Sequence, residues 1–139
     1  MSRRVPVLPI LVALFGLLVF QAGPARTAEI DLEIFYLPHR PAMEVVEKVE
    51  RIAAEFTGVT IRKYDFEDPE SRKAIDSHNI TEHMPIAMFV NGRDEFQIEN
   101  RTVLLRNFPK GDSFVPMYAG EWDYDDLRSI LTGLAGESR

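Results

Sequence analysis

Residues 30–58 read IDLEIFYLPHRPAMEVVEKVERIAAEFTG, a strand pattern that runs directly into a helix pattern. Apolar and acidic residues alternate at residues 30–34, which predicts a strand. Residues 35–37 are then all apolar, which is typical of a central strand covered on both faces. From Met43 the apolar residues recur at helical spacing, and Gly58 predicts the end of that helix. Residues 38–42, which include Pro38 and Pro41, separate the strand from the helical pattern, and Pro is tolerated in the first turn of a helix.

Further strands follow this first unit. Asn91 and Gly92 lie between two of them and are a strong signal for a tight hairpin turn. Runs rich in β-branched and aromatic residues predict strands at residues 59–66, 85–90, 95–98 and 102–105.

Two more helices are predicted from the residues that begin them. Asp68 followed by Pro69 predicts a short second helix, because Asp caps and Pro suits the first turn. Asp123, with Asp126 three residues later, predicts the start of the last helix. Strand–helix–strand units with short loops favour a parallel strand pair. We therefore expect an α/β domain with one mixed sheet of four to five strands and helices on both faces.

Residues 1–28 have the composition of a secretory signal peptide. Two arginines precede an uncharged apolar run at residues 5–20, and small residues follow at Gly23 and Ala25, where cleavage is expected. The alternative is an uncleaved anchor, although the run is short for a membrane span of about 20 residues. We therefore expect a periplasmic or secreted protein whose single domain covers residues 29–139.

Charge excludes some partners of this domain. Residues 1–28 hold three of the 16 basic residues and none of the 22 acidic ones, so residues 29–139 carry a formal net charge of −9. This charge disfavours nucleic acids and anionic membrane surfaces as partners. Contact with a membrane is expected only through the N-terminal segment, if that segment is retained.

The junction after the first strand is similar to a redox motif. Pro38 and His39 are the pair found inside the Cys-Pro-His-Cys of DsbA-type disulfide oxidoreductases, and Met84 with Pro85 resembles the cis-proline loop of the same fold. Together with the order of elements, these features make residues 30–135 resemble a thioredoxin-like domain. The stretch 99–120 is longer than the core of that family requires.

Leu37 and Arg40 stand where the family carries its two cysteines, and the chain contains no cysteine. Thiol–disulfide exchange requires a thiolate, so no such enzyme activity is expected. The resemblance implies that one exposed rim unites the two segments, with Pro85 in the cis form. That rim consists of Leu37, Pro38, His39, Arg40, His83, Met84 and Pro85.

Redox members of the family hold an extended peptide at this rim by strand addition, a binding mode that needs no cysteine. The resemblance therefore implies a redox-inactive module that binds a protein or an extended peptide, uses no cofactor, and serves as an accessory or assembly subunit of an envelope complex.

Other interpretations remain open. A partner could supply the cysteines, with this domain presenting the substrate. His39 and His83 could instead carry copper or zinc, since imidazole suits both metals, although the sequence has no characteristic metal-ligand spacing. The resemblance also places Asp31 near the family's buried acid, but a solvated acid is expected because there is no cysteine for it to serve. The stretch 99–120 either covers a sheet face or forms a hydrophobic docking surface.

Overall fold

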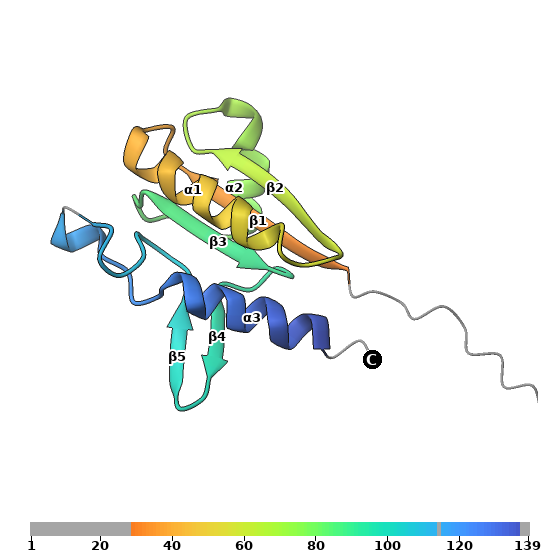
Figure 1. Cartoon of the computed structure of the whole chain (residues 1–139). Coiled ribbons are helices and arrows are strands. Elements are labelled where there is room, and N and C mark those ends of the chain that lie inside the picture. Colours follow the sequence, from red (N-terminus) through yellow and green to blue (C-terminus); the bar gives the residue numbers. More distant parts are fainter. Residues whose placement is uncertain (1–28, 114, 137–139) are drawn as a thin grey trace, which may run out of the picture.

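The computed structural model describes residues 29–113 and 115–136, and the predicted signal peptide, residues 1–28, lies outside them. Within these residues, no helix combines the length and the apolar character that a membrane crossing requires. The elements in chain order are β1 (Ile30–Tyr36), α1 (Arg40–Ala53), β2 (Val59–Asp65), the 3₁₀ turn η1 (Pro69–Ser71), α2 (Arg72–Ser77), β3 (Ile86–Val90), β4 (Glu95–Ile98), β5 (Arg101–Leu104), the 3₁₀ turn η2 (Pro116–Tyr118) and α3 (Tyr124–Gly136) (Figure 1).

The central strand β1 lies in a three-stranded sheet with the order β2–β1–β3. It runs parallel to β2 and antiparallel to β3, so that Phe35 lies between Tyr64 on one side and Ala87 on the other. Residues 32–35 are all buried. The predicted mixed α/β sheet, with a parallel first pair and a central strand covered on both faces, is confirmed to this extent.

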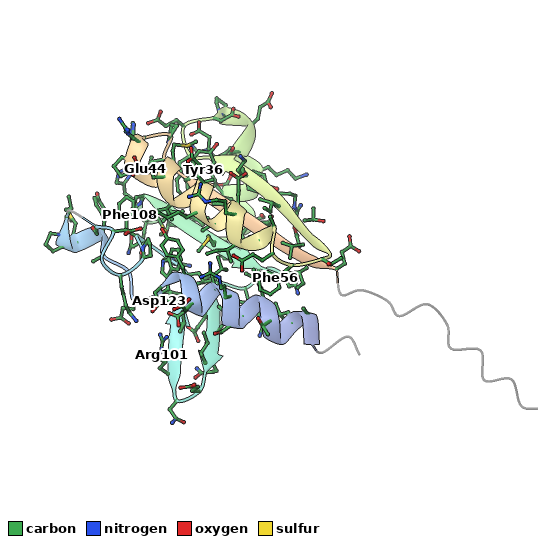
Figure 2. All side chains as sticks on the ribbon, viewed as in Figure 1. Tyr36, Glu44, Phe56, Arg101, Phe108 and Asp123 are labelled. Atoms are coloured by element: carbon green, nitrogen blue, oxygen red, sulfur yellow. The ribbon has the colours of Figure 1, made fainter. Side chains whose placement is uncertain are left out.

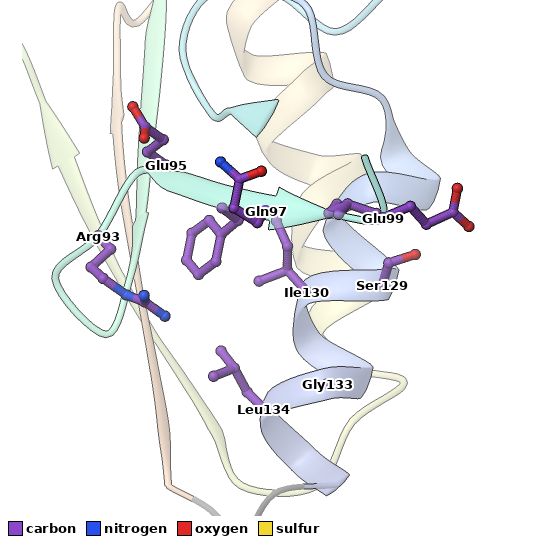
Figure 3. A pocket seen from close by; sticks show the side chains of 10 residues that line it. Arg93, Glu95, Gln97, Glu99, Ser129, Ile130, Gly133 and Leu134 are labelled. Atoms are coloured by element: carbon purple, nitrogen blue, oxygen red, sulfur yellow. The ribbon is translucent and has the colours of Figure 1, made fainter. Parts of the chain in front are cut away.

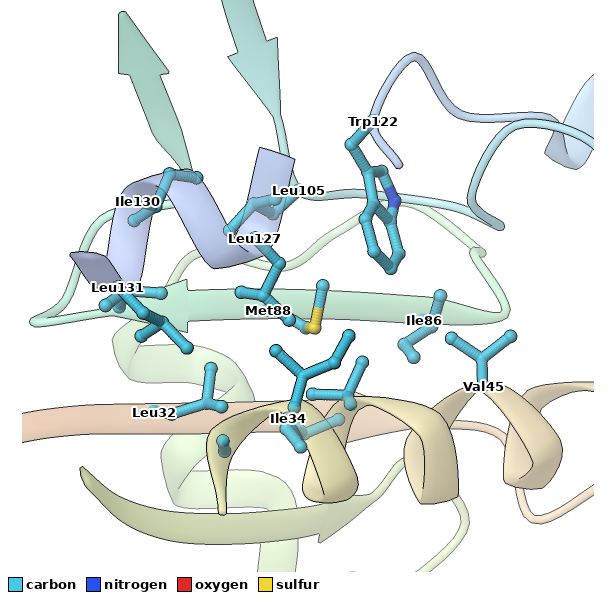
Figure 4. Packing of buried hydrophobic residues seen from close by; sticks show 14 of the residues in the cluster. Leu32, Ile34, Val45, Ile86, Met88, Leu105, Trp122, Leu127, Ile130 and Leu131 are labelled. Atoms are coloured by element: carbon cyan, nitrogen blue, oxygen red, sulfur yellow. The ribbon is translucent and has the colours of Figure 1, made fainter. Parts of the chain in front are cut away.

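Helices cover both faces of this sheet, as predicted. α1 and α3 pack on one face and α2 on the other (Figure 1). The face under α1 and α3 holds the larger core, in which Met88 is fully buried between the two helices (Figure 4). The smaller core, beneath α2, is built on Phe35. Other members of the larger core are Leu32, Ile34, Val46, Val49, Leu105, Trp122, Leu127 and Leu131.

The prediction of one sheet with four to five strands is wrong, because β4 does not continue the sheet beside β3. β4 and β5 form a separate antiparallel hairpin that projects from the domain (Figure 1). The place beside β3 is taken by residues 105–107. There the N–H of Met88 donates to the carbonyl of Leu105 at 2.9 Å, and the N–H of Asn107 donates to that of Ile86 at 2.9 Å.

Two turns account for the separate hairpin. The predicted turn at residues 91–92 is present, with both residues at positive φ, but it returns the chain only as far as Arg93, which bridges back to β3. A second turn at residues 99–100 then folds β5 onto β4. Leu105 closes the hairpin by donating its N–H to the carbonyl of Asp94 at 2.8 Å.

The end of α1 also differs from the prediction, since the helix stops at Ala53 rather than at Gly58. The N–H groups of Glu55 and Phe56 bond to carbonyls three residues back, which tightens the last turn and ends the α-helix. Gly58, at φ +85°, makes the turn into β2 instead.

The capping pattern at the start of α3 is confirmed. The N–H of Asp126 donates to the Asp123 carboxylate, and the N–H of Asp123 donates to the Asp126 carboxylate, each at 2.9 Å. Figure 2 shows Arg101 of the hairpin near Asp123, and the Arg101 guanidinium also binds Asp126. These bonds tie the projecting hairpin to the first turn of α3.

The connection from the hairpin to α3 is packed tightly against the domain. The indole N–H of Trp122 donates to the carbonyl of Asn107 at 3.0 Å, and the ring is fully buried. A Cβ atom on Gly120 would lie 2.4 Å from the carbonyl oxygen of Arg106 and 2.7 Å from that of Phe108, so this position requires glycine. Earlier in the stretch 99–120, Val103 and Leu105 are fully buried in the larger core.

We predict that Met88→Ala lowers the free energy of unfolding by about 2–5 kcal/mol, because it leaves a cavity between α1 and α3. Urea unfolding followed by circular dichroism measures this change. Met117→Ala is the matched control, since Met117 in η2 is 74% exposed and its loss should cost less than about 0.5 kcal/mol. Equal effects of the two substitutions would contradict the described core.

Candidate functional site

The two segments of the predicted rim lie next to each other. The main-chain N–H of Leu37, just after β1, donates to the carbonyl of Pro85, just before β3, at 2.9 Å. This contact extends the pairing of β1 with β3 beyond Tyr36 and Ile86, the last partners of the ladder. The end of β1 and the loop before β3 therefore form one continuous surface.

The rim residues differ in their exposure. Pro38, His39, Arg40 and His83 are exposed, and Leu37 is half-buried. Met84 and Pro85 are buried, contrary to their predicted place on an exposed rim, because the Met84 side chain belongs to the smaller core under α2. Met84 and Pro85 therefore support the rim from below, while the other residues can meet a partner.

Pro85 also departs from the family pattern. Among the described residues there is no cis peptide bond, so the bond between Met84 and Pro85 is trans. The cis form implied by the resemblance is not found. A trans bond is the ordinary state of an X–Pro peptide, and it gives the main chain before Pro85 a different direction from that of a cis-proline loop.

A hollow of about 230 Å³ opens between Leu37 and the loop before β3. Among the described residues, no hydrogen bond is formed by the main-chain groups of residues 81–84, which lie outside any helix or strand at the mouth of this hollow. Those of residues 81–83, which are exposed, are available to an extended chain placed alongside, whereas Met84 is buried. The hollow has an apolar wall of Leu37, Phe66, Ile75, Ile80 and Met84, and its polar lining is Arg72, Thr81, Glu82 and His83.

Arg40 lies on a different hollow from the other rim residues. Its guanidinium binds Glu44 one turn along α1 at 3.2 Å, and its side chain is 91% exposed. Together with Lys48, these residues line a hollow of about 360 Å³ between α1 and the turn at residues 111–112. Of the predicted rim residues, Leu37, His83 and Met84 line the first hollow and Arg40 lines the second.

The second depression is closed at one end by a charged hydrogen-bond group. The carboxylate of Asp112 accepts hydrogen bonds from Lys48 at 3.0 Å and from the Tyr124 hydroxyl at 2.8 Å. Partial burial alone would raise the pKa of Asp112, but these two bonds outweigh it and lower that pKa. Burial and the bond to Asp112 raise the pKa of Tyr124 above its ordinary range. The group joins the 109–113 turn to α1 and α3.

The histidines proposed as metal ligands have separate partners. The His39 ring faces Glu67 at 3.6 Å, whereas the His83 ring lies against Tyr118 with ring centroids 6.4 Å apart. The two imidazoles make no hydrogen bond or ring contact with each other. In the part of the chain that the structure describes, no cluster of three or more His, Cys, Asp or Glu side chains could hold a metal ion.

A buried polar pair behind the rim was missed by the sequence analysis. His78, at the C-terminal end of α2, contacts Glu33 of β1, with 2.8 Å between His78 Nε2 and the carboxylate. Only 8% of the Glu33 side chain and 14% of the His78 side chain are exposed, and the Phe35 and Phe89 rings pack on the imidazole.

Glu33, not Asp31, is the buried acid of β1. Asp31 is half-exposed and is bound by Arg62, as expected of a solvated acid. The sequence held a signal for the burial of Glu33: it shares a strand face with Phe35, in a segment that is otherwise buried on both sides. Because His78 immediately precedes the loop of residues 79–85, the pair with Glu33 anchors the base of the rim.

Comparisons of the chain with protein-family models, with curated proteins and with solved structures find no match. The site is therefore defined by the chain's own geometry: a hollow, a free main-chain segment, the exposed His83 in the lining and a buried Glu–His support.

We predict that Asp112→Asn lowers the free energy of unfolding by about 1 kcal/mol at pH 7, because the substitution weakens two bonds to a partly exposed charge. The folded-state pKa of Asp112 is lowered. Its contribution is therefore present above the unfolded pKa of about 3.9 and is lost as pH falls through the folded pKa. The unfolding curves of both proteins should therefore converge as pH falls below the folded pKa.

Asp76→Asn is the control for this pH dependence. Asp76 is exposed, and its side chain makes no ion pair with a described residue. The difference in stability between the Asp76→Asn variant and the wild type should stay close to zero across the same pH range. A stability difference between the wild type and the Asp112→Asn variant that persists unchanged at low pH would contradict the assigned role of the carboxylate.

We predict that Glu33→Ala costs about 1–3 kcal/mol of stability, because it leaves the buried His78 ring without its partner. Hydrogen–deuterium exchange should also accelerate at residues 79–85, which follow His78. Asp31→Ala removes the half-exposed pair with Arg62 and should cost less than about 1 kcal/mol, with unchanged exchange in that loop. Similar exchange rates in both variants would show that Glu33 does not anchor the loop.

Proposed function

We propose that this chain is an exported, redox-inactive domain of the thioredoxin type that binds an extended segment of a partner protein at the hollow beside Leu37. The observation that carries the proposal is the exposed, free main-chain segment at residues 81–83, which borders an apolar hollow of about 230 Å³. Main-chain groups of this kind can bond to a strand, while the hollow accepts one of its side chains.

The arrangement of the domain supports the thioredoxin-type assignment in part. The order of strands and helices agrees with the resemblance, and the loop before β3 contacts the end of β1 as the resemblance implies. The separate hairpin and the trans bond at Pro85 depart from it. What the proposal retains is the place of binding, and it does not require the cis-proline geometry.

The chemistry of the site favours binding over catalysis. The positions of the two family cysteines hold Leu37 and Arg40, and neither side chain can form a thiolate. Leu37 instead contributes to the apolar wall of the hollow. His39 and Arg40 lie beside Glu67 and Glu44, so the rim offers both signs of charge to a partner.

Export follows from the order of residues in the segment 1–28, which has the basic, apolar and small-residue regions of a signal peptide. We accordingly place the partner in the periplasm or outside the cell, where an accessory subunit of an envelope complex would act. The copper or zinc alternative has less support, since His39 and His83 face different partners.

The test is selection of phage-displayed random 12-residue peptides on the mature domain, followed by titration of the selected peptides. We predict that Thr81→Trp, which fills the mouth of the hollow, weakens their binding at least tenfold. Thr57→Trp is the matched control, because Thr57 is exposed and lies near the start of β2 rather than at the hollow. Bound peptide should also slow amide exchange at residues 81–83.

Selected peptides that bind wild type and Thr81→Trp equally would overturn the location of the site. Insulin reduction by the purified protein above the rate in buffer would overturn the redox-inactive part of the proposal. Circular dichroism of each variant establishes that lost binding does not reflect an unfolded domain.

A further inference from the structure

A second groove, which shares no residue with the rim, lies between the projecting hairpin and α3. It has a volume of about 610 Å³ (Figure 3). Its α3 side is formed by Ile130 and Leu134, with the small residues Ser129 and Gly133 leaving room between them. A Cβ atom added to Gly133 would meet no atom within 4 Å, so the groove is open at this point.

The groove follows the free edge of β4. All four residues of β4 line it, and because side chains of a strand alternate between faces, a hollow lined by all of them runs along the edge. Glu99, in the turn that follows, lines its end. In the described chain β4 pairs only with β5, on its other side. A two-stranded hairpin is marginal by itself, and a third strand on β4 would extend it.

The two sides of β4 differ in chemistry. Phe96 is buried and Ile98 half-buried, and both pack toward α3. Glu95, Gln97 and Glu99 are exposed. A strand added to β4 would therefore meet apolar residues on its inner face and polar or acidic residues on its outer face.

Charge decides which strand fits. Among the described residues, neither Glu95 nor Glu99 has a basic group within 4 Å. Near the start of β4 the Arg93 guanidinium lies over the Phe96 ring, 4.9 Å from its centroid. Glu95 begins β4, and Glu99, at φ +52° in the turn, follows its end, so both ends of this edge are acidic. Basic residues of an added strand would be favourable beside these two carboxylates.

We propose that this groove binds an extended segment of a partner protein in which basic and apolar residues alternate, added as a third strand to β4. The apolar residues contact Ile130 and Leu134, and the basic residues face Glu95 and Glu99. The proposal uses no residue of the rim and stands or fails separately from the function proposed there.

The test uses two acetylated and amidated eight-residue peptides, one alternating lysine with valine and one alternating glutamate with valine. We expect the mature domain to bind the lysine peptide at least tenfold more tightly in fluorescence anisotropy. Gly133→Phe, which fills the groove, should weaken that binding at least tenfold. Gly136→Phe is the matched control, since a Cβ there also meets nothing and Gly136 does not line the groove.

The double variant Glu95→Lys with Glu99→Lys provides an independent check, and it should reverse the preference toward the glutamate peptide. Lysine-peptide binding that survives Gly133→Phe would reflect only the acidic surface in general and would overturn the proposal. A wild-type dimer that Gly133→Phe dissociates in sedimentation experiments would place a second copy in the groove and would also overturn it. Thr81→Trp should leave binding of the lysine peptide unchanged.

Discussion

Burial of both faces of β1 is the constraint on which the rest of the structure depends. One face of the strand enters the core under α1 and α3 through Leu32 and Ile34, and the other enters the core under α2 through Phe35. A strand with two apolar faces needs a layer on each side, since neither face can remain in water without loss of the hydrophobic contribution. The three helices meet that need.

This constraint also sets the position of the candidate site. β1 can remain buried only while neighbours flank it, and it leaves the sheet where the bond between Leu37 and Pro85 ends the pairing with the β3 side. The Glu33–His78 pair is the polar exception within the smaller core, and both partners are satisfied there. Burying an acid is tolerated because the imidazole and Arg62 compensate for lost hydration.

The segment after β3 covers the edge of β3 that faces away from β1. Residues 105–107 supply the hydrogen bonds there, after the chain has made the β4–β5 excursion. Trp122 and the close approach at Gly120 then fix the return path to α3. The hairpin is thereby left outside the sheet, with one edge on the groove beside α3 and its tip held through Arg101.

The sequence by itself determined the elements and the residues that cap the starts of η1 and α3. Strand alternation, helical spacing and the pairs Asp68–Pro69 and Asp123–Asp126 are local signals, and the structure bears them out because a few neighbouring residues decide each one. The contact between Leu37 and Pro85 was also expected, but from the resemblance and not from a local pattern of residues. Only the tertiary structure decided which strand lies beside β3, that Met84 is buried, and that Glu33 meets His78. These outcomes depend on contacts between residues far apart in the chain. Alternative pairings of this kind compete in energy, and the hydrophobic pattern of one segment alone does not indicate which pairing is more stable.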